Sequence, residues 1–354
     1  MDRRTLLKGG LVTTAGGLLV PAVDGFTESA EAAPRVSKVL ARNLSTPWGI
    51  AFLPNGNALV GERDSGKVFV VRKGGGRGQV GRLSVRSQKA NWGEGGLLGL
   101  ALHPQFSTNR WVYAYISTGS DNRIVRMRFA DGSLGRPRVV LAGIPTNTHH
   151  NGGRLVFHGG LLYASTGDAE NGSLAQNRGS LAGKILRLTP GGEVPQGNPF
   201  GNYTWSYGHR NIEGIAFDSD GRLWATEFGD DRRDELNRIV RGGNYGWPRT
   251  EGGDGRGGYR DPLTTWRPEN CSPSGVAIAN GRAFIGALRG HALWAVRLGG
   301  PNKGRRARYF HERFGRIRTV QKAPDGALWI TTSNRDGRPS DPHRDDDRII
   351  RVSL

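Results

Sequence analysis

The stretch "EGIAFDSDGRLWATE" (residues 213–227) contains the unit from which the fold can be predicted. A small residue lies inside a first apolar strand, an Asp220-Gly221 turn follows, and a second apolar strand comes after the turn. Asp-Gly is one of the dipeptides favoured in tight β-hairpins. The stretch therefore predicts two antiparallel strands joined by a short turn.

The same pattern occurs six times along the chain, each time followed by a polar loop and a third strand. The first strands are "WGIAF" (48–52), "LGLAL" (98–102), "GRLVF" (153–157), "EGIAF" (213–217), "SGVAI" (274–278) and "RTVQK" (318–322). Repeats of roughly 44–61 residues, each built from β-strands, are typical of propeller blades. The sequence predicts an all-β fold, a six-bladed β-propeller over residues 35–354, with most of the core between adjacent blades. Residues 36–44 are expected to supply the outer strand of the last blade. A pair of β-sandwiches is the alternative, but equal repetition argues against it.

The first 34 residues are expected to be a targeting segment and not part of the fold. Arg3 and Arg4 precede a modest apolar stretch, and "SAEAAP" (29–34) provides a small-residue cleavage site. This order resembles a twin-arginine signal peptide, which predicts export of the protein to the periplasm, the cell envelope or the medium. An ordinary basic signal peptide or a retained anchor is the alternative. No other segment has the ~18 apolar residues that a membrane-spanning helix needs.

Composition limits the remaining possibilities. Cys271 is the only cysteine, so no internal disulfide can form. The formal net charge of the 354 residues is +19, and about +20 without the targeting segment. Nucleic acid is not expected as a partner of an exported protein, whereas an anionic envelope, an acidic redox partner or an acidic ligand fits this charge. A surface made basic for solubility would also explain most of it.

The repeat register predicts that the reactive side chains lie at one face of the propeller. In a blade, the loop before the first strand and the loop after the second strand lie at the same end of the central channel. The residues expected there are Glu94, His149, His150, Arg210, Asn211, Asn270, Arg316 and Arg318, together with residues 62–64, Asp168, residues 227–230, Arg289 and residues 333–334. The turns at the opposite face carry almost no reactive groups.

Two groups of side chains suggest chemistry at this face. Four arginines from three blades suit a small ligand with several carboxylates, because guanidinium binds carboxylates bidentately. They are Arg210, Arg289, Arg316 and Arg318. The alternative is that each arginine pairs with a nearby acid and ties blades together.

A histidine and an acid form the second group. Asp168 follows the strand after His150 and lies on the same face, where a carboxylate would fix the imidazole tautomer and strengthen it as a general base. His149 would point to the other side of an extended chain. Nearby, the loop at residues 227–237 is rich in acids beside a glycine, which is a weak signal for Ca²⁺.

Taken together, several motifs resemble the soluble pyrroloquinoline-quinone (PQQ)-dependent glucose/sorbosone dehydrogenases, also called aldose sugar dehydrogenases. These motifs follow one another in the order of the family, from about residue 45 to the C-terminus. They are "GEGGLLGLALHP", "HHNGGRLVF", "STGD", "YGHRNIEGIAF", "DELNRIVRGGNYGWP", "ALRG" and "RIRTVQKAPDG". The pairing of "GHRN" with "GGNYGWP" about thirty residues later is the most specific part of this resemblance.

The resemblance implies a six-bladed propeller that oxidises an aldose with PQQ and Ca²⁺ and passes the electrons to a separate acceptor, an acidic redox protein or a quinone. It implies that His150 is the general base, that Asp168 orients it, and that Arg210 and Asn211 lie against the quinone. Contacts to the rest of the cofactor are implied for Glu94, Phe228, Asn270, Arg289, Arg316 and Arg318. Backbone carbonyls of Gly229 and Asp230 would hold the catalytic Ca²⁺, and Glu235 and Tyr245 match positions linked to a structural Ca²⁺.

Two positions depart from the family pattern. Phe228 replaces a polar residue beside cofactor and sugar, and Asp230 replaces the usual proline, which would bring an extra carboxylate to the metal. A Ca²⁺-dependent propeller hydrolase or lactonase and a non-catalytic binding propeller are the two alternative functions. A hydrolase would need the metal but no quinone, which would leave the four arginines without a purpose.

Overall fold

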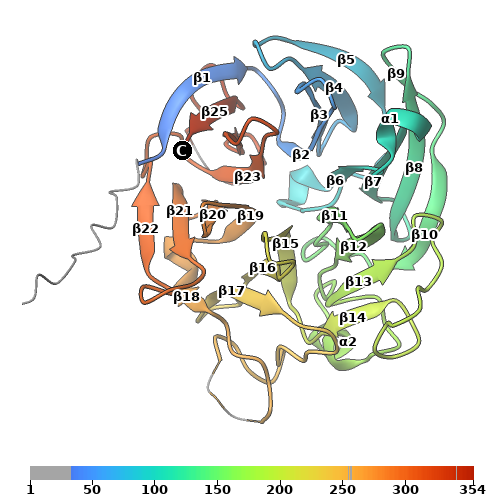
Figure 1. Cartoon of the computed structure of the whole chain (residues 1–354), viewed down its shortest axis with the longest axis vertical. Coiled ribbons are helices and arrows are strands. Elements are labelled where there is room, and N and C mark those ends of the chain that lie inside the picture. Colours follow the sequence, from blue (N-terminus) through green and yellow to red (C-terminus); the bar gives the residue numbers. More distant parts are fainter. Residues whose placement is uncertain (1–32, 254, 256, 340) are drawn as a thin grey trace, which may run out of the picture. The chain divides into compact units, whose positions relative to one another are not determined.

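Six small antiparallel sheets contain nearly all the regular structure in the computed structural model, and they follow one another around a common centre as the blades of a β-propeller (Figure 1). The structure describes residues 33–253, 255, 257–339 and 341–354. The predicted all-β, six-bladed fold is confirmed. The predicted targeting segment covers residues 1–34, and residues 1–32 of it lie outside the described residues.

The first three blades follow the chain order from the inner strand outward. Blade 1 contains β2 (Pro47–Phe52), β3 (Ala58–Glu62), β4 (Lys67–Val71) and β5 (Arg77–Arg82). Blade 2 contains β6 (Leu97–Leu102), β7 (Trp111–Ser117), β8 (Asn122–Ala130), the short β9 (Ser133–Leu134) and β10 (Arg138–Ile144). Blade 3 contains β11 (Leu155–His158), β12 (Leu161–Ser165), β13 (Lys184–Leu188) and β14 (Thr204–Tyr207).

The remaining blades repeat this order. Blade 4 contains β15 (Asn211–Phe217), β16 (Leu223–Phe228), β17 (Asp234–Ile239) and β18 (Thr264–Trp266). Blade 5 contains β19 (Pro273–Ala279), β20 (Arg282–Ala287), β21 (Ala292–Arg297) and β22 (Arg306–Tyr309). Blade 6 contains β23 (Ile317–Lys322), β24 (Leu328–Thr332), β25 (Ile349–Ser353) and the N-terminal β1 (Arg35–Ala41). The described helices are short: α1 (Phe106–Asn109), α2 (Gly172–Gln176) and the 3₁₀ turns η1 (Lys89–Asn91) and η2 (Pro268–Asn270).

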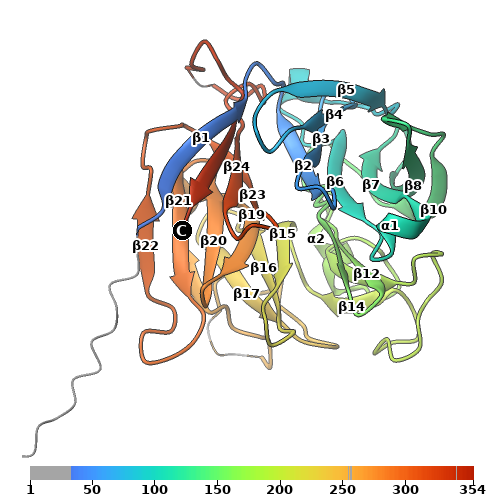
Figure 2. The same cartoon turned by 45° about the horizontal axis from the view of Figure 1, so that its top comes forward.

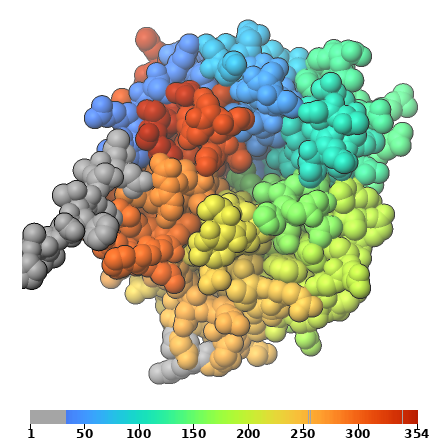
Figure 3. Space-filling view, in the orientation of Figure 1, coloured from blue at the N-terminus to red at the C-terminus, as the bar shows by residue number. Residues whose placement is uncertain are grey.

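The N-terminal strand closes the ring, as the sequence predicts. β1 pairs antiparallel with β25, from Arg35 opposite Ser353 to Ala41 opposite Ile349. Figure 1 places β1 beside β25, and Figure 2 shows β1 against the red strands of the last blade. In the space-filling view the blue N-terminal residues lie against the red C-terminal ones (Figure 3). The last blade is therefore built from both ends of the described chain.

Glycines in the first strands allow neighbouring blades to approach closely. A Cβ on Gly99 would lie 2.3 Å from the carbonyl oxygen of Gly153 in the next blade, and a Cβ on Gly214 would lie 2.3 Å from the carbonyl oxygen of Ser274. These distances are well inside van der Waals contact, so a side chain at either position would force the inner strands apart. This explains the small residue that recurs in the sequence pattern.

The hydrophobic core lies between the blades. Six clusters of buried apolar side chains fill the six blade–blade interfaces, for example Leu59 with Val112 between blades 1 and 2, and Val60 with Trp329 between blades 6 and 1. Each sheet buries both faces, which is why β3 and β6 read as nearly continuous apolar runs.

A buried arginine lies among the residues that line the central channel. The channel, about 610 Å³ in volume, is lined by the inner strands of all six blades and contains Arg154. The Arg154 guanidinium lies 3.8 Å from the Trp48 ring and donates hydrogen bonds to the carbonyl oxygens of Trp48 and Glu213. Burial lowers the pKa of Arg154 to about 9.

No helix among the described residues is long and apolar enough to cross a membrane.

Candidate active site

A cavity of about 780 Å³ lies where the sequence places the reactive loops. Its lining comes from the loops that precede first strands and those that follow second strands, and within the described residues five blades contribute to it. The predicted residues that line it are Glu94, His150, Arg210, Phe228, Gly229, Asp230, Arg289, Arg316 and Arg318. A cavity of this size is in the range of sites for small molecules and cofactors.

His150 and Asp168 form the predicted pair. Nδ1 of His150 lies 2.7 Å from Oδ1 of Asp168, and Asp168 is 1% exposed behind the imidazole. The other Asp168 oxygen accepts a hydrogen bond from Nε1 of Trp247 at 2.7 Å. Because an ionised carboxylate can only accept, this arrangement places the imidazole proton on Nδ1 and leaves the lone pair on Nε2. Nε2 makes no hydrogen bond within the described part of the chain.

The backbone at His150 is in the left-handed region, with φ of 58°. Its N–H donates to Oε2 of Glu94 at 2.9 Å, and its carbonyl packs so closely on Gly167 that a Cβ there would lie 1.9 Å away. Non-glycine residues in this region are uncommon and concentrate at functional sites. Two loops of different blades thus hold the imidazole in place.

His149 also faces the cavity, so the expectation that it points to the other side is wrong. That expectation assumed an extended chain, whereas the left-handed turn at His150 changes the direction of the backbone. Nδ1 of His149 lies 2.7 Å from Oε1 of Glu170, and both side chains are about one-third exposed. A second histidine–carboxylate pair therefore reaches the cavity wall, through His149.

Arg210 lies between a carboxylate and an aromatic ring. Its NH2 donates to Oδ1 of Asp230 at 2.7 Å, and its guanidinium lies 5.4 Å from the Trp247 ring. Its Nε is buried and has no hydrogen-bond partner among the described residues. Below it, Glu227 accepts from the Arg210 backbone N–H and lies 2.9 Å from Nδ1 of His209. An orphaned guanidinium N–H at a cavity wall is a donor available for a ligand.

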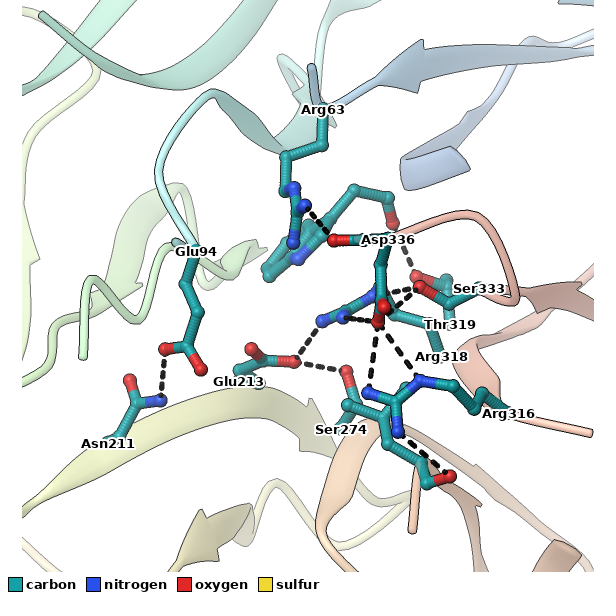
Figure 4. Close-up of polar contacts among 12 residues, drawn as sticks. Arg63, Glu94, Asn211, Glu213, Ser274, Arg316, Arg318, Thr319, Ser333 and Asp336 are labelled. Carbon is teal, nitrogen blue, oxygen red and sulfur yellow. Dashed lines mark hydrogen bonds and ion pairs between the residues drawn. The ribbon is translucent and has the colours of Figure 1, made fainter. Parts of the chain in front are cut away.

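Arg316 and Arg318 form the cavity floor, but acids of the protein already bind them (Figure 4). Arg316 donates to Oδ2 of Asp336 through Nε at 3.0 Å and NH2 at 2.9 Å. Arg318 donates to Glu213 at 2.7 Å and to the same Asp336 oxygen at 3.2 Å. Both arginines are almost fully buried, 6% and 1% exposed. The ion-pair alternative of the sequence analysis thus holds for these two residues.

The charges in this network affect one another strongly. Burial opposes ionisation of Asp336, but the cations of Arg316 and Arg318 outweigh it and hold the pKa of that carboxyl well below its usual range. Glu94 behaves in the same way: burial would raise its pKa, but Arg338, whose NH2 lies 2.9 Å from Oε1 of Glu94, lowers it. The floor of the cavity therefore keeps fixed charges at neutral pH.

Arg289 differs from the other predicted arginines. It is exposed at the cavity wall, just after β20, and within the described residues its guanidinium makes no hydrogen bond or ion pair. Of the four, it is the arginine with all its side-chain donors free to bind a ligand carboxylate.

Two predicted cofactor contacts do not line the cavity. Asn211 is fully buried beneath it, where Nδ2 donates to Glu94 at 3.2 Å and Oδ1 accepts from the Gly152 N–H. Asn270 is the last residue of η2 and lies in a separate outer hollow. The 3₁₀ turn explains this correction, because it directs Pro268 and Glu269 to the cavity and Asn270 to the opposite side.

Backbone oxygens suited to a metal are found at the end of β16. Phe228, Gly229 and Asp230 all line the cavity, and the carbonyl oxygens of Gly229 and Asp230 accept no hydrogen bond from the described residues. Free carbonyls are ligands that Ca²⁺ prefers. The Asp230 carboxylate, expected as an additional ligand, is instead paired with Arg210.

Glu235 and Tyr245 lie below the cavity lining. Glu235 accepts hydrogen bonds from Asn237 Nδ2 at 2.8 Å and from the Gly252 N–H at 2.6 Å. Burial and then the charge of Glu227 raise the pKa of Glu235 to about 8. The Tyr245 ring stacks on His209, 4.6 Å between centroids. No group of three acidic, histidine or cysteine side chains among the described residues could hold a metal, so an ion here would also need backbone oxygens.

Comparison with known proteins identifies the family. Residues 44–344 match the model of the family described as Glucose / Sorbosone dehydrogenase. The chain belongs to this family. The structure of the PQQ-bound form of aldose sugar dehydrogenase from Streptomyces coelicolor is similar, with a TM-score of 0.86 and 44% identity over 90% of this chain and 97% of that chain.

Two relatives support membership of the glucose/sorbosone dehydrogenase family. Aldose sugar dehydrogenase YliI of Escherichia coli is 30% identical over 338 residues, covering 85% of this chain and 90% of the relative. Quinoprotein glucose dehydrogenase B of Acinetobacter calcoaceticus is 30% identical over 286 residues, covering 70% of this chain and 60% of the relative. Sequence resemblance to this family is thus confirmed.

In this member of the family, the cavity contains residues that sequence reasoning missed. They are Trp92, Asp234, Pro268, Glu269, Ser272, Leu288, His291, Arg338 and Pro339. Burial raises the pKa of Asp234 to about 6, and its carboxylate accepts the N–H groups of Gly229 and Ser272. Arg338 could have been found, because it belongs to the loop after β24, which the repeat register places at this face.

Proposed function

We propose that the protein is a PQQ- and Ca²⁺-dependent dehydrogenase that oxidises an aldose at its anomeric hydroxyl to the lactone. The observation that carries the proposal is the His150–Asp168 pair, 2.7 Å apart, at the wall of a cavity that also presents Arg210 and Arg289. Family membership supports a sugar dehydrogenase in general; the cofactors and the role of His150 are part of the proposal.

The cavity residues fit PQQ, which is a flat tricarboxylate. The cavity volume of about 780 Å³ is adequate for a cofactor of this size. Arg289 and the orphaned Nε of Arg210 provide free cationic donors, while Phe228, Leu288 and Pro268 provide apolar surface. When bound, PQQ supplies the two-electron oxidant of the reaction, and Ca²⁺ supplies a Lewis acid beside it.

The protein's own residues would manage the proton. Nε2 of His150 would accept the proton of the anomeric hydroxyl, and the hydride of the anomeric carbon would be taken up by the two-electron oxidant that PQQ supplies. Asp168 keeps the imidazole proton on Nδ1 and stabilises the positive charge that develops on the ring. Trp247 and the Glu170 N–H fix the Asp168 carboxylate in turn. Such positioned bases contribute about 10²–10⁴-fold to rates.

Residues near the mouth would hold metal and ligand. Carbonyl oxygens of Gly229 and Asp230 would bind Ca²⁺, and Arg289 would bind a cofactor carboxylate. Arg316 and Arg318 contribute cationic potential from the floor, although their hydrogen bonds go mainly to Asp336 and Glu213. Glu235, with the backbone near Tyr245, would hold a structural Ca²⁺.

Neither alternative function is favoured. A Ca²⁺-dependent hydrolase would make no use of the unpaired Arg289, and a binding propeller would not need an oriented imidazole with a free Nε2. Export from the cytoplasm remains part of the proposal, and it rests on residues 1–34 of the sequence.

The test is reconstitution of the purified protein with PQQ and Ca²⁺, followed by dye reduction with a panel of aldoses. We expect turnover for the wild type, loss of turnover for His150→Ala, and PQQ binding by absorbance titration in both. His158→Gln is the matched control, since His158 ends β11, the first strand of the same blade, at its opposite end, stacked on Phe217. Absence of PQQ binding at micromolar levels, or full activity of His150→Ala, would refute the proposal.

A further inference from the structure

We propose that an outer hollow between blades 4 and 5 is the docking site for an acidic electron-carrier protein. This inference rests on the proposed function, because a dehydrogenase needs an acceptor for the electrons taken from the sugar. We call the site the arginine hollow. Its lining is Arg233, Thr265, Trp266, Arg267, Asn270, Trp294, Arg306 and Arg308.

The arginine hollow has an unusual charge distribution. Its volume is about 740 Å³, and four of the residues that line it are arginines, whereas none is an acid. All four arginines are exposed. Arg267 forms a long ion pair with Glu269, 3.9 Å apart on side chains 71% and 55% exposed. The charge of Arg308 also acts on Glu312, which lies outside the hollow lining. Exposed pairs of this kind are worth little, so the hollow keeps a net positive charge.

Aromatic rings hold part of this charge in place. The Arg306 guanidinium lies 5.4 Å from the Trp266 ring and 5.9 Å from the Trp294 ring, and Arg308 lies 5.7 Å from the Trp294 ring. Arg306 also donates to the carbonyl oxygen of Thr265. Cation–π contacts and this hydrogen bond restrict the guanidinium groups before a partner arrives. Arginine and tryptophan are also enriched at protein–protein interfaces and among their hot-spot residues.

The position of the hollow links it to the proposed active site. The 3₁₀ turn η2 is a shared wall: Pro268 and Glu269 line the cavity, while the flanking Arg267 and Asn270 line the arginine hollow. Trp294 lies on the hollow side of this wall, and its Nε1 donates to the carbonyl oxygen of Asn270 at 3.3 Å. A redox centre that docks in the hollow is therefore separated from a cofactor in the cavity by a single short turn.

The electron balance requires an acceptor outside the sugar and the proposed cofactor. Oxidation of one hydroxyl to the carbonyl level removes two electrons and two protons from the sugar. Both electrons must pass to the acceptor before the next sugar reacts, and the protons go to solvent. A haem protein that takes one electron must therefore dock twice per turnover. Repeated fast encounters favour electrostatic steering, which raises association rates by about 10–10³-fold.

The proposed experiment compares two electron acceptors of the holoenzyme loaded with PQQ and Ca²⁺. One acceptor is an uncharged benzoquinone and the other is a c-type cytochrome of negative net charge. The test variant is Arg267→Glu with Arg308→Glu, because both side chains are exposed and neither touches the cavity. Its matched control is Arg136→Glu with Arg138→Glu, an equal charge change on exposed arginines of blade 2, across the ring.

We expect the test variant to lose about 10-fold or more of kcat/KM for the acidic cytochrome and to keep the benzoquinone rate. The control variant keeps both rates. In a titration without sugar, the affinity of the test variant for the oxidised cytochrome falls in parallel, and the wild-type affinity falls with rising salt. The melting temperature of each variant checks that the fold is retained.

Other results would overturn the inference. An unchanged cytochrome rate in the test variant would move docking elsewhere, such as the mouth of the cavity. Equal losses with both acceptors would assign the arginines to turnover and not to docking. Binding of the wild type to immobilised polyglutamate, with unchanged cytochrome kinetics in the variant, would assign the hollow to an anionic polymer. An inactive wild type with benzoquinone would instead refute the proposed function itself.

Discussion

The Asp168 carboxylate holds two rings from different blades, with His150 Nδ1 on one oxygen and Trp247 Nε1 on the other, both at 2.7 Å. The carboxylate therefore has no oxygen free to rotate toward solvent. We predict that Asp168→Asn lowers kcat about 100-fold or more, because an amide can donate to Nδ1 and favour the wrong imidazole tautomer. PQQ affinity should stay close to that of the wild type. Steady-state kinetics and an absorbance titration measure the two effects, and an unchanged kcat would contradict the role of Asp168.

Arg289 should matter for the cofactor and little for the fold. Its guanidinium is exposed and unpaired within the described residues. Removing a charge-assisted contact costs about 1.5–3 kcal/mol, so Arg289→Met should weaken PQQ binding about 10- to 100-fold. Thermal unfolding of the apoprotein should change by only a few tenths of a kcal/mol. If PQQ affinity does not change, Arg289 is not a cofactor ligand.

Arg318 should show the opposite behaviour. It is 1% exposed, and its loss would leave Glu213 buried with Ser274 as its remaining side-chain partner. Breaking one partner of a buried ion pair costs about 3–5 kcal/mol. We therefore expect Arg318→Met to lower the free energy of unfolding of the apoprotein by that amount in denaturant titrations. A stable Arg318→Met apoprotein would mean that the residue is kept for the ligand alone.

Acid should unfold the protein partly through Asp336. The pKa of this carboxyl is well below its usual value in the folded state, so the unfolded state binds more protons as the pH falls through the usual aspartate range near 4. The contribution is complete above that range and is lost below it. We expect Asp336→Asn to be less stable at neutral pH by about 3 kcal/mol and to show a shallower loss between about pH 5 and pH 3. Equal slopes for both proteins would argue against this role.

Calcium should stabilise the protein through Glu235. This carboxylate is buried beside Glu227, so a bound cation would offset their repulsion. We expect chelation to lower the melting temperature and added Ca²⁺ to restore it, whereas Glu235→Gln should keep the Asn237 contact and lose the response to Ca²⁺. Asp220→Asn, at a hairpin turn of the same blade, is a control that should respond as the wild type does.

The propeller could be predicted from sequence because its determinants are local. The hairpins of five blades carry their own turn residues, whereas the first two strands of blade 2 are joined by a longer connection that contains α1. First strands also carry a small residue where the next blade approaches, as Gly99 and Gly214 show. Local signals repeated six times leave few alternatives. The register then placed His150, Asp168 and Arg289 at one face without any knowledge of their contacts.

The partners of the site residues could not be predicted in the same way. Asp336 binds Arg316 and Arg318 from a loop without periodicity, and Glu213 reaches Arg318 from a different blade. The left-handed backbone at His150 depends on close packing against Gly167, which no residue spacing reveals. For Asn270, the 3₁₀ turn η2 determines that the residue lines the arginine hollow and not the cavity.

The pairing of β1 with β25 has a consequence for biosynthesis. The sixth blade joins the first described strand to β25, so the ring cannot close until residues 349–353 have been synthesised. Until then, β1 has no edge to pair with, and the apolar side chains of Leu40 and Ile50 lack the neighbours that Trp329 and Ile349 later provide. A chain truncated before residue 349 should therefore remain open and prone to aggregate, however well its first five blades have formed.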